Sequence, residues 1–329
     1  MLCRGITALF LLLVGMAYAQ QPDPAQRVRT AYEVENKVRL SGVLRTTTVL
    51  QTGEVQSEVV IYRKQGMTRY EYRAPELGGL VLIDKGNTLI RLNPAARTAT
   101  VETVHRSPAT VDLVLKNYQA SLVGQERLLG RLADVVTLKP RKGSGPSRKM
   151  WIDRLTGVVL RTEQYNSAGK LVSRSTYLSV DWNANPDDSL FSVPAGWKQT
   201  QSPLQSERHW DKAELSRRVG FTVREPSYVP PGFILDGFHL VYRPNMLPSA
   251  HIRYVDGLNS ISVFEHRCPP GAGRGRGFQW GQRMGRRGNC ELFTSNEGNV
   301  LVKEAGGIRF IVVGDLPEAE LQKVMDSLR

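Results

Sequence analysis

The amino-acid sequence predicts an α+β protein: a curled antiparallel sheet, a half-barrel around helices, followed by a smaller α+β domain. Residues 110–123 carry apolar side chains at helical spacing, which predicts an amphipathic helix. About six strand-like runs precede this stretch and about five follow it. After a polar segment, strand-like runs resume, and the chain ends in another amphipathic stretch. Because a lone apolar helix between two sets of strands needs a surface to cover it, we expect the first sheet to curl over it.

The first 19 residues are typical of a signal peptide. Arg4 precedes an apolar run at 6–16 that is too short to cross a membrane, and residues 17–19 form a small-x-small cleavage sequence. We therefore expect cleavage after Ala19 and an exported, soluble mature chain; the family resemblance given below implies the periplasm. Cys3 lies before the apolar run, so it cannot become a lipid-anchoring cysteine at the new N-terminus.

The first domain is expected to span residues 20–199. It begins with a helix at 24–37, where Val28, Ala31 and Val34 form an apolar stripe among charged residues. Turn sequences such as Gln65-Gly66 separate the strand runs that follow. Strands are expected at 38–48, 55–64, 67–73, 80–83, 88–92 and 98–104, then at 132–139, 149–152, 158–164 and 171–180.

A second domain, residues 209–329, is expected after a polar linker at 200–208 that contains Pro203 and has no apolar period. Helices are expected at 210–219 and 318–328, where apolar residues recur on one face. Strands are expected at 233–242, 250–255, 260–266, 290–294, 300–304 and 308–313. This half therefore reads as a small sheet with helices.

The formal net charge of +13 favours anionic partners. For an exported protein these are lipid head groups, a phosphorylated glycolipid or an acidic protein, with peripheral contact to a membrane. Nucleic acid is disfavoured as a partner because the signal peptide directs the chain out of the cytoplasm.

Two cysteines remain after processing, Cys268 and Cys290. In an oxidising compartment an isolated pair is most simply a disulfide. Such a bond would contribute about 3 kcal/mol by the chain-entropy estimate.

Two stretches carry a resemblance to known families. The hairpin at 151–172, WIDRLTGVVLRTEQYNSAGKLV, with its Asp-x-x-Thr-Gly and Asn-x-x-Gly turns, resembles periplasmic lipoprotein carriers of the LolA/LolB type. The stretch at 214–235, with its Pro-x-Tyr-Val-Pro-Pro-Gly-Phe string, resembles the start of the C-terminal domain in the RseB/MucB family. Members of that family are periplasmic regulators that bind an anti-sigma factor.

The resemblance implies an apolar, lipid-accepting cavity in the first domain and a second domain that helps to grip a partner. It implies a non-enzymatic regulator that binds the periplasmic segment of an anti-sigma factor and senses an acyl chain or anionic lipid. The alternative is a periplasmic carrier or chaperone for lipoproteins or lipids, with no signalling partner.

The apolar face of residues 110–123 is the first candidate site. Its members are expected to line a pocket for acyl chains, with two tyrosines of a neighbouring strand at the rim, or else to form an ordinary core. These residues are Val111, Val114, Leu115, Tyr118 and Leu122, with Tyr70 and Tyr72 at the rim.

A basic, glycine-rich segment at 269–288 is the second candidate, and it has no counterpart in the family. Its arginines can clamp phosphates or carboxylates, because guanidinium binds both in a bidentate manner. The alternative is a solvated excursion held at its base by the two cysteines. The arginines are Arg274, Arg276, Arg283, Arg286 and Arg287.

Catalytic and metal-binding signals are weak, so we expect a non-enzyme without cofactor or metal. His239, His251 and His266 fall on three expected strands, but no zinc-binding spacing accompanies them. Residues 167–170 match Ser-x-x-Lys, yet they lie in a hairpin turn and lack the accompanying motifs of penicillin-binding enzymes.

Overall fold

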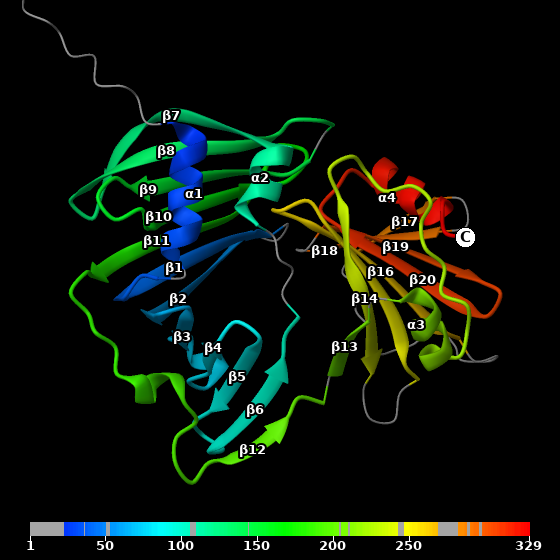
Figure 1. Ribbon diagram of the computed structural model, residues 1–329, viewed down its shortest axis with the longest axis horizontal. Helices are drawn as coiled ribbons and strands as arrows, with labels where there is room; N and C mark the ends of the chain where they lie inside the picture. Colours follow the sequence, from blue (N-terminus) through cyan, green and yellow to red (C-terminus); the bar gives the residue numbers. More distant parts are fainter. Residues whose placement is uncertain are drawn as a thin grey trace, which may run out of the picture.

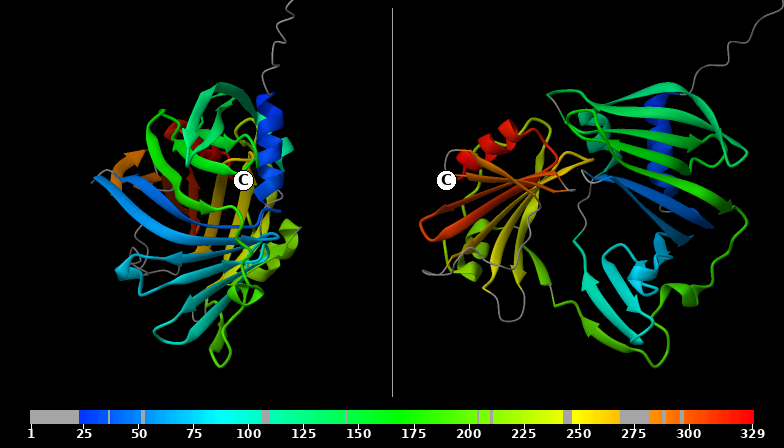
Figure 2. Two further views of the ribbon diagram at one scale, coloured as in Figure 1. Left: turned by 90° about the vertical axis from the view of Figure 1, so that its left-hand side faces the viewer. Right: turned by 180° about the vertical axis from the view of Figure 1, so that it is seen from behind.

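The computed structural model describes residues 23–329, apart from 36, 51–52, 106–109, 144, 204, 210, 243–246, 269–281, 288–289 and 296–297. Two open, curled sheets of 12 and 8 strands lie next to each other (Figure 1, Figure 2). The predicted signal peptide lies outside the described residues. Helices are short, so the fold is mostly β, and the predicted α+β class overstates the helical share.

The larger sheet has the strand order β12-β6-β5-β4-β3-β2-β1-β11-β10-β9-β8-β7. Strand β1 pairs with both β2 and β11, which brings the two predicted groups of strands into one sheet. The Gln65-Gly66 turn forms between β2 and β3, as predicted. The strands are β1 (Leu40–Leu50), β2 (Gly53–Lys64), β3 (Met67–Tyr72), β4 (Val81–Asp84), β5 (Thr88–Asn93), β6 (Thr98–Thr103), β7 (Tyr118–Leu128), β8 (Arg131–Pro140), β9 (Ser147–Asp153), β10 (Val159–Tyr165), β11 (Leu171–Asp181) and β12 (Lys198–Gln201).

Helix α1 (Pro24–Glu35) confirms the first predicted helix and lies across the sheet over β8–β11 (Figure 1). Its apolar stripe places Val28 and Ala31 in the core. Two 3₁₀ turns, η1 (Pro75–Leu77) and η2 (Asp188–Phe191), follow β3 and β11. From η2, Phe191 packs on the β4–β6 part of the sheet, where Trp197 also packs.

The predicted helix at 110–123 is only half correct. Helix α2 covers Val111–Asn117, and from Tyr118 the chain continues as β7. Strand β7, which contains the part wrongly predicted as helix, pairs with β8 from Tyr118 opposite Pro140 to Leu128 opposite Arg131, with a register shift between Leu122 and Gly124. A short apolar run fits a helix or a strand locally, and pairing with a long neighbouring strand decides the outcome.

The smaller sheet has the order β13-β14-β15-β16-β20-β19-β18-β17. Helices α3 (Lys212–Val219) and α4 (Glu318–Asp326) cover the same face, because Leu215, Val219, Leu321 and Val324 belong to one core. The strands are β13 (Gln205–His209), β14 (Ile234–Tyr242), β15 (Ser249–Val255), β16 (Ser260–Arg267), β17 (Gln282–Arg287), β18 (Cys290–Ser295), β19 (Gly298–Ala305) and β20 (Ile308–Gly314). Every strand predicted in this half is present, and β17 is added from within the predicted loop.

The predicted linker contributes an edge strand to each sheet. Strand β12 pairs in parallel with β6, and β13 pairs in antiparallel fashion with β14. Just beyond β6, the ring of His105 reaches across, with 2.9 Å between its Nε2 and the Ser206 carbonyl oxygen. The two halves are therefore connected by more than the covalent chain.

The predicted disulfide is absent, since Cys268 and Cys290 are both free. Cys268 directly follows β16 and Cys290 begins β18, with β20 and β19 between these strands. Three strand spacings separate the cysteines by about 14 Å, whereas a disulfide requires Cα atoms within about 7 Å. The sheet order therefore excludes a pairing that sequence alone favours.

Candidate functional site

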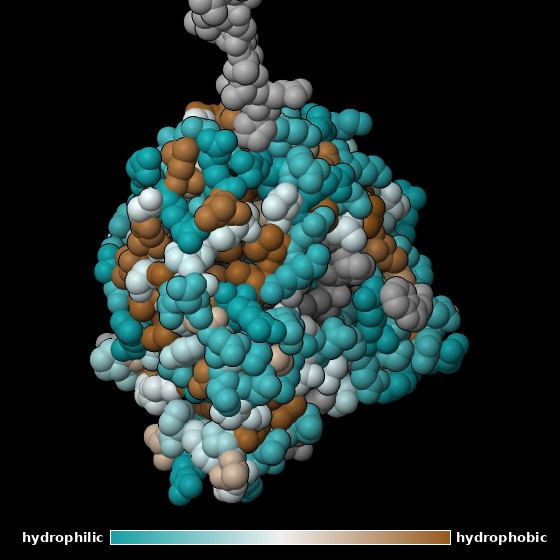
Figure 3. Space-filling model, turned by 60° about the vertical axis from the view of Figure 1, so that its left-hand side comes forward, coloured by the Kyte–Doolittle hydropathy of each residue, from teal (hydrophilic) through white to brown (hydrophobic). Residues whose placement is uncertain are grey.

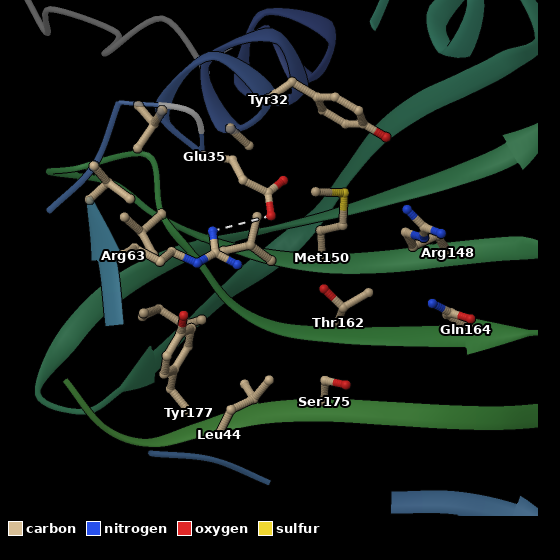
Figure 4. A pocket seen from close by; sticks show the side chains of 16 residues that line it. Tyr32, Glu35, Leu44, Arg63, Arg148, Met150, Thr162, Gln164, Ser175 and Tyr177 are labelled. Carbon is tan, nitrogen blue, oxygen red and sulfur yellow. Dashed lines mark ion pairs between the residues drawn. The ribbon is translucent and has the colours of Figure 1, made fainter. Parts of the chain in front are cut away.

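A cavity of about 350 Å³ lies between α1 and the sheet (Figure 4). We call it the α1 cavity. It is lined from α1, from the segment that follows it, and from β1, β2, β9, β10 and β11. The lining residues are Ala31, Tyr32, Val34, Glu35, Val38, Leu44, Arg63, Arg148, Met150, Val158, Val159, Leu160, Thr162, Gln164, Ser175 and Tyr177.

The apolar part of the α1 cavity follows from strand alternation. Leu160, Thr162 and Gln164 are alternate residues of β10, so they point to the same face of the sheet. Ser175 and Tyr177 do the same on β11. Both strands thus grade from an apolar to a polar residue along the cavity.

Charged groups stand at both ends of the α1 cavity. At one end the Arg63 guanidinium lies 3.1 Å from a Glu35 carboxylate oxygen, and at the other lie Arg148 and Gln164 (Figure 4). Nε of Arg63 is buried without a hydrogen-bond partner among the described residues. Burial alone would lower the pKa of Arg63, but nearby Tyr177 and Glu35 raise it overall, so the cation is secure.

The arrangement suits an amphiphile with one anionic group. The volume corresponds to about twelve water-sized volumes, and the size is within the range of small-molecule sites. Apolar side chains also gather near the centre of the face drawn in Figure 3, among hydrophilic ones. Apolar walls bury a short chain, while either arginine is placed to pair with its anionic end.

None of the residues predicted to line an acyl pocket is among the lining of the α1 cavity. The covering helix is α1 rather than α2, because the strand that follows α2 takes the rest of the predicted helix into the sheet. Val114 and Tyr118 are buried in a core that Val111, Leu115 and Leu122 join from its side. Tyr70 and Tyr72 pack on the core cluster beside the cavity.

Sequence reasoning did not identify the residues that line the α1 cavity. The stripe of α1 was visible in the sequence, but nothing in it distinguishes Val34, which faces the cavity, from Val28, which faces the core. Arg63 and Arg148 lie on predicted strands among many other basic residues. Their convergence depends on strand pairing between β1 and β11, a contact between distant segments.

A second feature joins the two halves around Asp256. The Tyr118 hydroxyl donates to the Asp256 carboxylate at 2.5 Å, and the Asn259 side-chain amide donates to the Tyr118 oxygen at 2.6 Å. The Asn117 amide donates to the carbonyl oxygens of Gly232 and Asp256 at 2.7 and 2.8 Å. Burial and the adjacent Asp256 raise the pKa of Tyr118 far above its ordinary value, so the hydroxyl keeps its proton.

Close backbone packing accompanies these hydrogen bonds. A Cβ atom on Gly257 would lie 2.8 Å from the Val114 backbone nitrogen, and Gly257 has a φ of +104°. Any larger residue would therefore push α2 away from the turn between β15 and β16. Leu258, from the same turn, packs on the core that contains Val114 and Tyr118.

A groove of about 670 Å³ lies over this contact, and we call it the junction groove. One wall comes from the end of α2 and the segment after β8, and the other from the proline-rich segment before β14 together with the start of α4. Its lining residues are Lys116, Asn117, Tyr118, Pro140, Arg141, Lys142, Gly143, Gly145, Tyr228, Pro230, Pro231, Gly232, Phe233, Ile234, Asp256, Leu316 and Glu320.

Histidine rings form a row across the two halves. His105, from beyond β6, lies 5.8 Å from His239, which lies 5.4 Å from His251, measured between ring centroids. His251 then stacks on Phe264 at 4.2 Å. Burial lowers the pKa of His239 to about 4 and that of His251 to about 3, so both rings are neutral near pH 7. Within the described part of the chain, no three His, Cys, Asp or Glu side chains, this row included, are arranged so that they could hold a metal ion.

The basic glycine-rich segment is only partly within the described residues. Arg274 and Arg276 lie outside them, while Arg283, Arg286 and Arg287 belong to β17, whose backbone pairs with β18. Their role in binding anions stays a prediction. In the parts of the chain that the structure covers, no helix is long and apolar enough to cross a membrane.

Two curled sheets, a cavity under α1 and a groove between the sheets place the protein in the class of mostly-β proteins with two joined halves. Comparisons with known proteins identify the family. The family model of the MucB/RseB N-terminal domain matches residues 81–195. Over this part and in its curated relatives, the chain is similar to the RseB/MucB family.

Curated relatives span both halves. The sigma-E factor regulatory protein RseB of Escherichia coli is 22% identical over 288 residues, which are 81% of this chain and 82% of RseB. The sigma factor AlgU regulatory protein MucB of Pseudomonas aeruginosa is 26% identical over 213 residues. That match covers 64% of this chain and 60% of MucB, less than two thirds of its length.

Solved structures share the fold. In the complex structure of Pseudomonas aeruginosa MucA/MucB, one chain matches with a TM-score of 0.64 and 19% identity, over 94% of this chain and 99% of that chain. A crystal structure of MucB in complex with MucA(peri) matches with a TM-score of 0.59 and 20% identity, over 93% and 98% of the two chains.

Proposed function

We propose that this protein is an exported, non-enzymatic regulator that binds the periplasmic segment of an anti-sigma factor and responds to a lipid-like ligand in the α1 cavity. The observation that carries the proposal is a single packed core between the cavity and the junction of the two halves. The names of the relatives, and the MucA complexes of MucB, support the partner.

The core in question contains Val28 and Ala31 of α1, Val114 of α2 and Tyr118 of β7. Ala31 also lines the α1 cavity, and Tyr118 also lines the junction groove. Packed interiors rearrange in discrete steps rather than deforming freely. A ligand that displaces α1 must therefore repack the side chains on which the junction is built.

The proposed ligand is an amphiphile with an apolar chain and an anionic group. Burying eight methylenes would contribute on the order of 6 kcal/mol. Pairing the anionic group with Arg148 or Arg63 adds a charge-assisted hydrogen bond. This assignment moves the lipid site from the face of α2 to that of α1.

The first test identifies the partner. The mature chain, immobilised and exposed to detergent-solubilised envelope of its own cells, should retain a single-span protein whose cytoplasmic part binds a sigma factor. Mass spectrometry names what is retained. If lipoproteins are retained and no such protein is found, the carrier function replaces the regulatory one.

The second test concerns the ligand. Thr162→Trp places an indole in the middle of the α1 cavity, and we expect it to weaken binding of 11-(dansylamino)undecanoic acid by at least about tenfold. Fluorescence titration measures the affinity.

Thr176→Trp on β11 is the matched control, because Thr176 lies between the cavity residues Ser175 and Tyr177 and points to the opposite face. The control should bind the probe as the unmodified chain does. Equal affinities for the two variants would refute the α1 cavity as the lipid site.

A further inference from the structure

The junction groove has two walls of opposite character. From the N-terminal half, the exposed cations Lys116, Arg141 and Lys142 face the groove. Within the described residues, none of the three lies within salt-bridge distance of a carboxylate. Nε of Arg141 donates to the Leu115 carbonyl oxygen at 3.3 Å, which holds its guanidinium beside the end of α2.

The opposite wall is mainly apolar and stiff. Tyr228, Pro231, Phe233 and Ile234 form its apolar part, and Ile234 is 49% exposed. Glu320 also lines this wall, where its carboxylate is paired with Nζ of Lys323 at 2.7 Å. The prolines fix their backbone angles, and the Tyr228 hydroxyl donates to Glu320 at 2.5 Å. Little conformational entropy remains to be lost on this wall when a ligand binds.

The floor of the groove is held by the hydrogen bonds around Asp256. Asp256 accepts from the Tyr118 hydroxyl and from the backbone amides of Leu258 and Asn259. These hydrogen bonds satisfy its carboxylate, and Asp256 is only 6% exposed, so it forms part of the floor and is largely shielded from direct contact with an occupant. The site is preformed, and an occupant contacts both halves at once.

We propose that the junction groove binds an extended, acidic polypeptide segment. Side chains of an extended strand alternate between two faces. A strand with carboxylates on one face and apolar residues on the other satisfies the cationic and the apolar wall together. An acyl chain would leave the three cations without partners, and a lipid head group alone would leave the apolar wall exposed.

This inference rests on the proposed function, because it assigns the acidic part of the anti-sigma segment to the junction groove. It also gives the segment a mechanical role. A strand in the groove bridges α2 and the proline-rich segment before β14, so it stabilises one arrangement of the two halves. A ligand that repacks the core beneath α2 would then weaken the hold on the segment.

The test uses the full mature chain and a fluorescein-labelled octapeptide of alternating aspartate and valine. Its counterpart with lysine in place of aspartate is the peptide control. Fluorescence anisotropy should show binding of the acidic peptide only. The triple variant Lys116→Glu, Arg141→Glu, Lys142→Glu should bind it at least about tenfold more weakly, since three attractive charges become repulsive.

The triple variant Lys85→Glu, Lys170→Glu, Lys198→Glu has the same net charge and is the matched protein control. These three lysines are exposed and lie outside the groove lining. It should bind the acidic peptide nearly as the unmodified chain does. Equal loss in both triples would overturn the proposal, because only net charge would then matter. Phosphatidylglycerol vesicles that bind through the groove cations while the peptide does not would overturn it as well.

Capture of the anti-sigma factor from envelope extract separates the two proposals. Loss of capture in the groove triple, with capture kept in the control triple, supports the groove. Capture kept in both triples overturns the groove assignment and leaves the regulatory function standing. No capture by the unmodified chain removes the function, and peptide binding alone then decides the groove.

Discussion

Tyr118 connects the two halves through a single hydroxyl. It donates to Asp256 and accepts from Asn259, and Tyr118 and Asp256 are both buried. A buried carboxylate that loses a donor keeps its desolvation penalty without the compensating bond. Removing the hydroxyl should therefore weaken the contact between the two halves.

We predict that Tyr118→Phe lowers the free energy of unfolding by about 1–3 kcal/mol and separates the unfolding of the two halves. Urea denaturation followed by tryptophan fluorescence and circular dichroism measures both effects. Tyr165→Phe is the control, because Tyr165 makes a similar bond to Glu163 within the larger sheet. Coincident transitions in Tyr118→Phe would contradict the prediction.

The histidine row makes stability depend on pH. The pKa of His239 is lowered to about 4, mainly by burial and then by His105, Arg208 and Arg253 against an opposing effect of Asp236. Below pH 6.5, His239 of the unfolded chain binds a proton, whereas His239 of the folded chain stays neutral until about pH 4. Stability is therefore lost as the pH falls through this window.

We predict that acidification from pH 7 to 4 costs about 3 kcal/mol through His239 alone. His239→Leu should flatten the dependence of unfolding free energy on pH. Nε2 of His239 is buried without a hydrogen-bond partner in the described residues, so His239→Leu removes no hydrogen bond made by that atom. Parallel stability curves for variant and unmodified chain would refute the assignment.

At the scale of elements, the turn between β9 and β10 supports α1. A Cβ atom on Gly157 would lie 2.8 Å from Cγ2 of Thr30 and 3.2 Å from Cγ2 of Val34, and Gly157 has a φ of +78°. Both contacts are with α1, which roofs the cavity. The glycine thus sets how closely the helix approaches the sheet.

We predict that Gly157→Ala destabilises the chain by about 1–3 kcal/mol and changes affinity for the dansyl fatty acid. Gly169→Ala is the control, because Gly169 has a φ of +73° and nothing within 4 Å of its would-be Cβ. Gly169→Ala should destabilise the chain only through the strain of its positive φ. The difference between the two melting curves therefore isolates the contact with α1. Identical melting curves would contradict the prediction, because they would show that α1 moves away from the added methyl group at no cost in stability.

Elements with a clear period were predictable, and the others were not. Alternation predicted the strands of both sheets apart from β7, β12, β13 and β17, and turns such as Gln65-Gly66 fixed their ends. The run beginning at Tyr118 was mistaken for helix because its apolar spacing satisfies both periods. Strand β17 was missed because a glycine- and arginine-rich sequence has no alternation to read.

At the scale of the whole molecule, the binding surfaces were beyond local reasoning. The sequence resemblance pointed to the same family as the comparisons do, and it implied a cavity. The α1 cavity, however, needs a helix and five strands brought together, which depends on the pairing between β1 and β11. The cysteines illustrate the same limit, since only the order of four strands shows that they lie apart.

The parallel pairing of β6 and β12 affects how the two halves can move. Both strands run toward the smaller sheet, where β6 leads to His105 beside Ser206 and His239, and β12 leads to β13. A single peptide linker allows one body to swivel about its bonds. Because β12 is held along β6 in the larger sheet, the linker cannot swivel before Gln201, the last residue of β12. Motion between the halves should therefore begin only beyond Gln201, and the fixed strand limits the directions in which the junction groove can open and close.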